Sequence, residues 1–375
     1  MKKMVVGLHR KAYIKVDLDV IRQNIKYELT RMEKNQELFA VVKANAYGHG
    51  LVPVAKAAKQ AGATGFCVAV IDEGVALREA GLTETILVLG VTPSEDAPYL
   101  AEYELSTAVG DLEYLQQVYP LLKQSGQKLR VHLALDTGMG RIGFRDQASL
   151  LEALNFLQEH TKQFEFEGIF THFSTADAKD TTYYEQQLAR FEELMEVVEK
   201  RPRYVHVANS AAAVWHKDCG GNVVRFGITM YGLNPSGTEL VLPNEFQPAL
   251  SFESELVAVK RLAPGDGVGY GKTYTAKEHE WLGTVPVGYA DGWLRRMQGY
   301  HVLVGGELCE IVGRVCMDQF MVKLPHEFPL KTKVTLLSSG KDAPQSLQNA
   351  ATYADTITYE ILCGLSERVP RYYQN

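Results

Sequence analysis

The chain has 375 residues, of which 46% are hydrophobic and 22% are charged, and its formal net charge is −6. This length suits a barrel with a second domain, and the acidic balance argues against a general surface for nucleic acid. No apolar run approaches the ~20 residues needed to cross a bilayer, and the first ten residues lack the apolar core of a signal peptide.

From about residue 38 to residue 232, short apolar runs alternate with longer amphipathic stretches. Eight runs have the character of buried strands: Leu38–Val42, Gly65–Val70, Thr85–Leu89, Leu105–Val109, Leu129–Leu135, Glu167–Thr171, Arg203–Ala208 and Val223–Phe226. Helical patterns lie between them: Leu51–Gln60, Ile71–Ala80, Gln147–His160, Tyr184–Lys200 and Ser210–Trp215. Eight alternating units predict an α/β chain with an N-terminal, TIM-like (β/α)8 barrel. A doubly wound open sheet is the competing fold.

After Leu233 the character of the sequence changes. Residues 234–248 are rich in Pro, Gly and Asn and have the composition of a linker, and short strand patterns separated by turns follow. We therefore expect a barrel over residues 17–243 and a mostly β domain over residues 244–375, which the N-terminal strand within residues 1–16 joins.

A lysine closes the first apolar run, in the segment VVKANAYGHG at residues 41–50. Lys43 stands at the mouth of the first β/α unit, before a glycine-bearing turn, and there it can bring an amine to an anionic cofactor. A lone lysine after a strand is more often a solvated strand end. The turn that follows favours a Schiff-base lysine.

Further polar groups end the later runs, where the active sites of barrels lie. They are Asp136–Arg141 after the fifth run, His172 after the sixth, Asn209 and Ser210 after the seventh, and Arg225, Gly227 and Ile228 at the eighth. Ser210 begins a helix, where free N–H groups attract anions, although a plain N-cap is the simpler interpretation. Together with Lys43 and Gly227, these residues favour a phosphate-bearing cofactor.

Three other patterns do not predict a site in this chain. The segment GDGVGYGKT at residues 265–273 has Asp266 where a phosphate loop needs its first glycine, and it also fails the dinucleotide fingerprint. The ten histidines show no metal-ligand spacing, so no metal is expected.

The five cysteines, Cys219 among them, are odd in number and far apart, which is typical of reduced thiols in a cytoplasmic protein.

Seven segments in both predicted domains closely resemble bacterial alanine racemases, which depend on pyridoxal 5'-phosphate (PLP). They are residues 41–50, 132–141 (HLALDTGMGR), 206–210 (HVANS), 224–228 (VRFGI), 288–293 (GYADGW), 312–318 (VGRVCMD) and 368–371 (RVPR). The resemblance implies a homodimer in which the β domain contributes to the partner subunit's active site. It also implies racemisation of alanine, which supplies D-alanine for the cell wall.

The resemblance assigns roles to individual residues. Lys43 matches the lysine that links covalently to PLP and acts as a base on one face, and Tyr270 matches the base that the partner subunit places on the other face. Arg225 matches the arginine that faces the pyridine nitrogen of PLP, and together with His172 it supplies charge and hydrogen bonds that help a phenol act as a base. A permanent cation disfavours a proton on that nitrogen, which should suppress side reactions such as transamination.

The remaining matches concern the ends of the cofactor and the substrate. The phosphate ligands correspond to Tyr47, Ser210, Gly227, Ile228 and Tyr359, with Asn209 beside them. Arg141 matches an arginine near the substrate carboxylate, Met317 matches a backbone contact to substrate with Asp318 beside it, and Tyr289 matches an aromatic gate. Two of the matched residues also have a purely structural alternative, which is a half-buried aromatic in a turn for Tyr270 and a salt bridge for Arg225.

One position departs from the family pattern. Many members carry a lysine, often carbamylated, where this chain has Ala134. Alanine cannot carry a carbamate, so we hypothesise that a chloride or a small carboxylate provides the counter-charge to Arg141. Two alternatives to alanine racemisation stay open. One is a racemase of serine or a basic amino acid, and the other is a non-catalytic PLP carrier, although such carriers lack the β domain and the second tyrosine.

Overall fold

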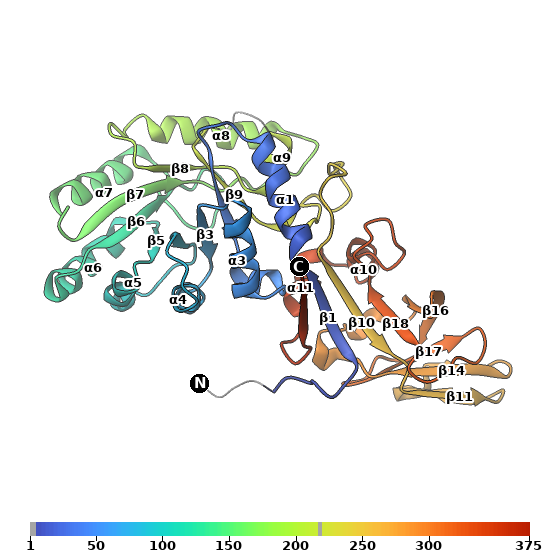
Figure 1. Cartoon of the computed structure of the whole chain (residues 1–375). Helices are drawn as coiled ribbons and strands as arrows, with labels where there is room; N and C mark the ends of the chain where they lie inside the picture. The colour runs from blue at the N-terminus through green and yellow to red at the C-terminus, as the bar shows by residue number, and fades with distance from the viewer. Residues whose placement is uncertain (1–4, 217–219) are drawn as a thin grey trace.

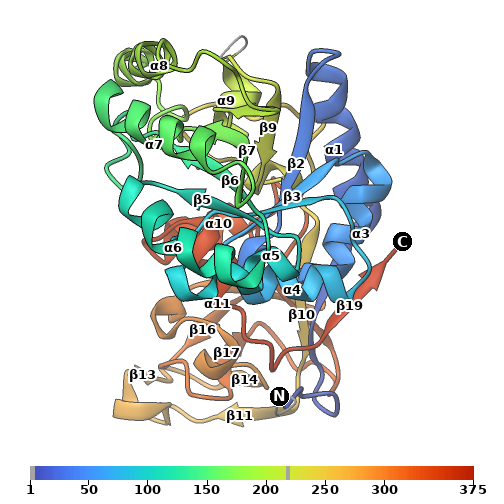
Figure 2. The ribbon, with the colours of Figure 1, turned by 90° about the vertical axis from the view of Figure 1, so that its left-hand side faces the viewer.

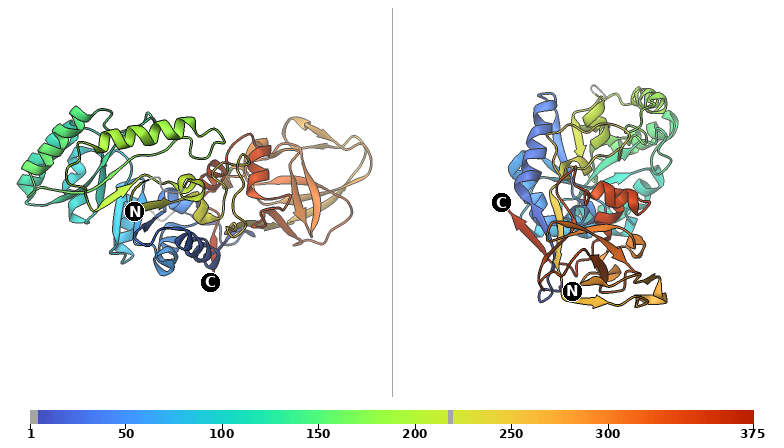
Figure 3. Two further views of the ribbon diagram at one scale, coloured as in Figure 1. Left: turned by 90° about the horizontal axis from the view of Figure 1, so that it is seen from above. Right: turned by 90° about the vertical axis from the view of Figure 1, so that its right-hand side faces the viewer.

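The computed structural model of the protein describes residues 5–216 and 220–375. Its two lobes lie end to end, a barrel formed by the first part of the chain and a β-rich domain formed largely by the last part (Figure 1; Figure 3, left). Residues 1–4 of the predicted N-terminal segment, and Cys219, lie outside the described residues. The other four cysteines are free thiols.

The barrel consists of eight parallel strands. They are β2 (Glu37–Val41), β3 (Gly65–Val68), β4 (Thr85–Val88), β5 (Ser106–Val109), β6 (Leu129–Ala134), β7 (Phe164–Phe170), β8 (Tyr204–His206) and β9 (Val223–Phe226). The order β8-β7-β6-β5-β4-β3-β2-β9 places the last strand beside the first. The Arg225 N–H donates to the Ala208 carbonyl at 3.0 Å and so joins β9 to the end of β8. The predicted barrel is confirmed, and the open sheet is wrong because its strand order would reverse midway.

Helices cover the outside of the barrel (Figure 2). They are α1 (Leu18–Arg31), α3 (Leu51–Ala61), α4 (Ile71–Glu79), α5 (Ala97–Glu102), α6 (Leu112–Ser125), α7 (Gln147–Glu159), α8 (Thr182–Met195) and α9 (Ser210–Trp215), and a short 3-10 turn, η1 (Ser94–Asp96), precedes α5. The carboxylates of Asp17, Asp111 and Asp146 cap the first turns of α1, α6 and α7 by accepting backbone N–H groups. Because both faces of the strands pack against side chains, the strands read as continuous apolar runs.

The second domain is built on a nine-stranded sheet in the order β11-β14-β17-β16-β15-β18-β10-β1-β19. The strands are β1 (Ala12–Asp17), β10 (Leu250–Glu255), β11 (Ala258–Leu262), β14 (Glu280–Val285), β15 (His301–Val304), β16 (Glu307–Val312), β17 (Phe320–Leu324), β18 (Lys333–Leu337) and β19 (Arg371–Gln374). A separate hairpin pairs β12 (Gly267–Val268) with β13 (Tyr274–Thr275). Strand β1 lies between β10 and β19, so both ends of the chain enter one sheet.

Two helices interrupt the otherwise β character of this domain, α10 (Leu347–Tyr353) and α11 (Thr358–Gly364). Four further 3-10 turns are η2 (Ile228–Tyr231), η3 (Tyr270–Lys272), η4 (Tyr289–Asp291) and η5 (Arg295–Met297). Neither α10 nor α11 was expected from the sequence. In the part of the chain that the structure describes, no helix has the length and apolar character that spanning a membrane requires.

Candidate active site

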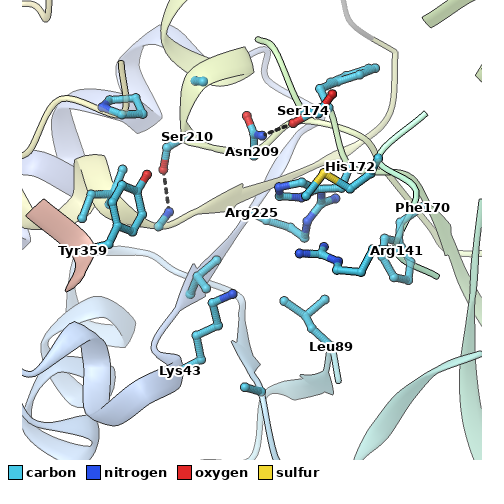
Figure 4. Close-up of a pocket in the computed structure, with 18 of the residues that line it drawn as sticks. Lys43, Leu89, Arg141, Phe170, His172, Ser174, Asn209, Ser210, Arg225 and Tyr359 are labelled. Carbon is cyan, nitrogen blue, oxygen red and sulfur yellow. Dashed lines mark hydrogen bonds between the residues drawn. The ribbon is translucent and has the colours of Figure 1, made fainter. Parts of the chain in front are cut away.

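A cavity of about 470 Å³ opens at the C-terminal ends of the barrel strands (Figure 4). Its volume falls in the usual range for small-molecule sites. Ten of the residues proposed from the sequence line it: Lys43, Tyr47, Arg141, His172, Asn209, Ser210, Arg225, Gly227, Ile228 and Tyr359. They come from β9, from the segments that follow β2, β6, β7, β8 and β9, and from α11, so elements far apart in the sequence build one site.

Lys43 is presented by an unusual backbone turn, α2 (Lys43–Tyr47). The four residues 44–47 all have φ between 51° and 54°, which is the left-handed region. Each such residue costs about 1–2 kcal/mol relative to a right-handed turn, so neighbouring groups must hold the turn. The Glu73 carboxylate accepts the N–H groups of Asn45 (3.3 Å) and Ala69 (2.9 Å), and the Asn45 side chain accepts the Leu51 N–H at 2.8 Å. No glycine stands at these four positions, so the sequence contained no signal for this turn.

The Lys43 amine points into the cavity (Figure 4). Burial lowers the pKa of this amine, and the nearby positive charge of Arg141 lowers it further. A depressed pKa increases the fraction of neutral amine at a given pH, and the neutral form is the one that attacks a carbonyl or accepts a proton. This environment suits a nucleophilic and basic lysine better than a solvated strand end.

Hydroxyl groups gather on the opposite side of the cavity. A Cβ placed on Gly227 would lie 3.1 Å from the Tyr47 hydroxyl and 3.6 Å from the Ser210 hydroxyl, so only a glycine leaves this space open. Burial raises the pKa of both Tyr47 and Tyr359, which therefore stay protonated and can donate. Neither hydroxyl makes a hydrogen bond to the residues that the structure describes. Free hydroxyl donors around a glycine form a cradle that fits a phosphate group.

The N-cap of α9 is Asn209, and not Ser210 as the simpler interpretation had it. The Asn209 side chain caps α9 by accepting the Ala212 N–H at 3.0 Å. The Ser210 hydroxyl oxygen accepts the Gly227 N–H at 2.8 Å, which leaves its own hydrogen available to donate. The Gly227 N–H is thereby engaged by Ser210, so it is the Ser210 hydroxyl that faces the cavity as a donor.

A buried chain of hydrogen bonds runs from Arg225 into the barrel. The Arg225 guanidinium donates to His206 Nδ1 at 2.9 Å, His206 Nε2 lies 2.8 Å from His132 Nδ1, and His132 Nε2 lies 2.9 Å from a Glu167 oxygen. Burial would raise the pKa of Glu167, but hydrogen bonds from His132 and Ser106 hold it below its usual value. A carboxylate therefore anchors the chain that ends at Arg225.

The donor properties of arginine fix every proton along this chain. Arginine can only donate, so His206 Nδ1 must accept and His206 must carry its hydrogen on Nε2. His132 Nδ1 then accepts, and His132 donates from Nε2 to Glu167. By the same logic His172, whose Nδ1 lies 3.3 Å from Arg225, carries its hydrogen on Nε2. Burial and the charge of Arg225 lower the pKa of His172 well below its usual value, so it is neutral.

Arg141 makes no hydrogen bond or ion pair to any residue within 5–216 or 220–375. Its guanidinium faces the cavity from the loop after β6 (Figure 4). Ala134, on β6, packs in an apolar cluster with Ala108, Phe170 and Leu89. No carbamylated lysine can provide a counter-charge here, and the apolar side chains packed around Ala134 offer no anionic group to replace it.

The other four proposed residues lie elsewhere on the chain. Tyr270, Met317 and Asp318 line a shallow depression on the β domain, and Tyr289 is adjacent, because its N–H donates to the Cys316 carbonyl at 3.1 Å. Tyr270 is 69% exposed. The hairpin that flanks it, marked by β13, lies at the end of the β domain remote from the barrel (Figure 2). Within one chain, the structure does not bring Tyr270 to Lys43.

Sequence reasoning missed several groups that shape the cavity. Glu167, His132 and His206 lie beneath it, and Asp177 lines it; burial raises the pKa of this last carboxyl. His132 and His206 stand in segments that were singled out, but their contacts join residues 74 positions apart and no spacing rule reports them. No group of three His, Cys, Asp or Glu residues that could hold a metal occurs among the described residues.

Comparison with known proteins is consistent with these observations. Residues 16–235 match the family model described as alanine racemase, N-terminal domain, and residues 249–373 match alanine racemase, C-terminal domain. A curated alanine racemase of Ligilactobacillus salivarius is 56% identical, over 99% of this chain and 100% of that protein.

Two solved structures are similarly close. An alanine racemase from E. faecalis is 51% identical with a TM-score of 0.95, over 99% of this chain and 100% of that one. A histidine racemase from Leuconostoc mesenteroides subsp. sake is 32% identical with a TM-score of 0.93, again over 99% and 100%. The shared architecture therefore occurs in enzymes named for more than one amino acid.

Proposed function

Since this chain belongs to the alanine racemase family, whose members are isomerases and depend on PLP in general, we propose that it interconverts L- and D-alanine with two bases, Lys43 and Tyr270. The observation that carries the proposal is the desolvated Lys43 amine, which opens into a cavity between two arginines and a cradle of hydroxyls. The product, D-alanine, would supply peptidoglycan synthesis. The four described cysteines are free thiols, which suits the cytoplasm as its place of action.

The residues present fit PLP. Bound there, PLP would supply a carbonyl that links to an amine and a conjugated ring that withdraws electrons from the substrate Cα. Tyr47, Ser210, Tyr359 and the open space at Gly227 would hold the phosphate, with Ile228 and Asn209 beside them. Arg225 would face the ring nitrogen, where a guanidinium can only donate because it keeps its charge, and the Glu167 chain would hold it in position.

Lys43 and Tyr270 would act from opposite faces of the substrate. One of them removes the α-proton and the other returns a proton to the opposite side, which inverts the configuration. Tyr270 is exposed and remote from Lys43 in its own chain, so the proposal requires a homodimer in which each β domain, residues 244–375 with the N-terminal strand, completes the barrel site of its partner (barrel residues 17–243).

A tyrosine base needs help, because an unperturbed phenol has a pKa of ~10. His172 can provide this help. It is neutral, its Nδ1 accepts from Arg225, and its Nε2–H is left to donate into the cavity. Donation to the phenolate form of an incoming Tyr270, together with the positive charge of Arg225, would favour loss of the phenol proton.

Substrate selection would fall to the remaining assigned residues. Arg141 would bind the substrate carboxylate, while Met317, Asp318 and the gate residue Tyr289 would arrive with the partner's β domain and narrow the entry. We also propose that a chloride or small carboxylate balances Arg141 near Ala134. Replacing chloride by bromide should give an anomalous peak beside Arg141, whereas water there, with activity indifferent to chloride, would contradict this part.

Incubation of the purified protein with L-alanine in D2O tests the function. Deuterium at Cα together with D-alanine is the expected result. A yellow protein without exchange would indicate a PLP carrier. Exchange of serine or histidine but not of alanine would indicate a racemase of another amino acid with the same fold. Alanine is favoured because the curated relatives at 48–56% identity are named for it, while the histidine racemase stands at 32%.

A further inference from the structure

A buried carboxylate in the β domain is not used by the chemistry above. Asp291 ends the η4 turn, and its side chain is fully buried. Arg10 Nη1 donates to one carboxylate oxygen at 2.9 Å and Arg10 Nη2 donates to the other, Arg368 Nε lies 3.1 Å from Oδ1, and the Gly288 N–H donates to Oδ2 at 3.0 Å. Two arginines and one backbone amide thus surround a single carboxylate, which is well compensated for its burial.

This cluster joins segments from both ends of the chain. Arg10 comes from the N-terminal segment and Arg368 from the C-terminal one, and the Gly7 N–H donates to the Arg368 carbonyl at 2.8 Å. The Asp291 carbonyl accepts the Ser366 N–H at 3.1 Å. Arg368 also donates to the carboxylate of Asp318, so one guanidinium bridges Asp291 and a proposed substrate-site residue.

The η4 turn and the loop over residues 316–318 are docked directly on each other. The N–H groups of Tyr289 and Ala290 donate to the carbonyls of Cys316 (3.1 Å) and Met317 (3.0 Å). A Cβ on Gly288 would lie 2.3 Å from each of these two carbonyl oxygens, so no other residue allows this approach. The backbones are therefore fixed, yet Tyr289 is 44% exposed and Met317 is 53% exposed.

From this arrangement we propose that Asp291, with Arg368, is the positioning residue for the face of the β domain that enters the partner's cavity. The carboxylate sits behind two loops whose outward side chains are Tyr289, Met317 and Asp318, and it sets their spacing before any contact is made. Because preorganised groups lose less freedom on binding, weakening the cluster should weaken substrate binding more than the proton-transfer step. The inference rests on the proposed function for the identity of the cavity, but the rigidity of the two loops is testable without it.

The test compares D291N with a matched control, E253Q. Glu253 is also a buried carboxylate of this domain with two basic partners, Lys15 (3.1 Å) and Lys333 (3.0 Å), but it touches neither loop. Hydrogen exchange is measured on the full chain for peptides that cover residues 286–293 and 314–320. We expect faster exchange in both peptides for D291N and unchanged exchange for E253Q. Equal behaviour of the two variants would overturn the proposal.

Kinetics provide the second readout. D291N should raise KM for alanine roughly tenfold, the loss of one charged hydrogen bond, with kcat nearly unchanged, and its effect should be non-additive with Tyr289→Phe. If D291N does not fold, R368K carries the test, because lysine keeps the charge but lacks the planar fork whose Nε and Nη2 reach Asp291 and Asp318 separately; a smaller shift in the same direction is expected. Additive effects, or a loss confined to kcat, would count against the inference. A wild-type protein without racemase activity would defeat the proposed function, while the exchange comparison would still decide this one.

Discussion

The barrel and the β domain present the residues of the proposed site in opposite ways. In the barrel, Arg225 is buried and His172 is half-buried, both are already hydrogen-bonded, and Lys43 is held by a strained turn. On the β domain, Tyr270, Tyr289 and Met317 are exposed, although the backbone beneath them is tied down. The contrast teaches that one half of the site is built within a chain, and that the other half is a surface prepared for a second chain.

The largest effect should come from the barrel half. Lys43→Ala removes the amine that binds the cofactor and serves as a base, so we expect racemisation to fall by at least ~10³-fold and the absorbance of the covalently bound cofactor to vanish. The matched control is Lys56→Ala, an exposed lysine of α3, which should change neither. Persistence of the absorbance band in the Lys43 variant would reject the assignment.

A slightly smaller effect should come from the β-domain half. Tyr270→Phe keeps the ring and removes the hydroxyl, so racemisation should fall by roughly 10²–10⁴-fold. Single-turnover exchange of the α-hydrogen in D2O should persist for one enantiomer, because Lys43 still serves its own face. Tyr372→Phe, at another half-exposed tyrosine of the β domain, serves as the control. Equal loss for both enantiomers would show that Tyr270 acts by shaping the site and not as a base.

The chain of hydrogen bonds from Glu167 to Arg225 tests whether the barrel half of the site is preorganised. Glu167→Gln keeps an acceptor for His132 but removes the charge, and we expect a loss of about 2 kcal/mol in the free energy of unfolding. Ser106→Ala removes only a neutral donor to the same carboxylate and should cost less, about 1 kcal/mol. Nitrogen-15 NMR should find His132 and His206 protonated on Nε2 in the wild type. A proton on Nδ1 of either ring would break the proposed chain.

A last effect, on stability alone, separates barrel stability from barrel chemistry. Burial raises the pKa of Glu28, on α1, to about 7, and the ion pair with Arg31 lowers it only partly. The folded state therefore binds a proton that the unfolded state, with a carboxyl pKa of ~4.3, has lost, and stability declines as pH rises from about 4 to about 7. Glu28→Gln should raise the free energy of unfolding at pH 8 by about 2 kcal/mol and change it little at pH 4. A destabilisation at pH 8 would show that the Arg31 pair dominates.

The sequence predicted the barrel because its signals are local. Each buried strand is a continuous apolar run, and the polar groups that end the runs, such as Lys43 and Arg225, necessarily meet on one rim. The same reasoning could not find α10 and α11, because their short lengths resemble turns in a β-rich context. It also placed the end of α8 too late, because the sequence pattern predicted a helix as far as Lys200 and the helix ends at Met195.

Local sequence patterns could not predict the contacts between segments that are far apart in the chain. The left-handed turn after Lys43 depends on Glu73 and contains no glycine at its four left-handed positions, so nothing local announces it. The chain from Glu167 to Arg225 joins four strands, and the Asp291 cluster joins both ends of the protein. The roles given to Tyr270, Met317 and Tyr289 came only from the family resemblance and remain predictions.

Mixing the two inactive variants tests most directly whether two chains share each site. Lys43→Ala and Tyr270→Phe subunits are unfolded and refolded together, and hybrid dimers are counted by native mass spectrometry. Random pairing leaves one intact site in each hybrid, so the mixture should regain about a quarter of wild-type activity. Hybrid dimers that form in the expected proportion but stay inactive would contradict the account, because Lys43 and Tyr270 would then have to act from the same chain.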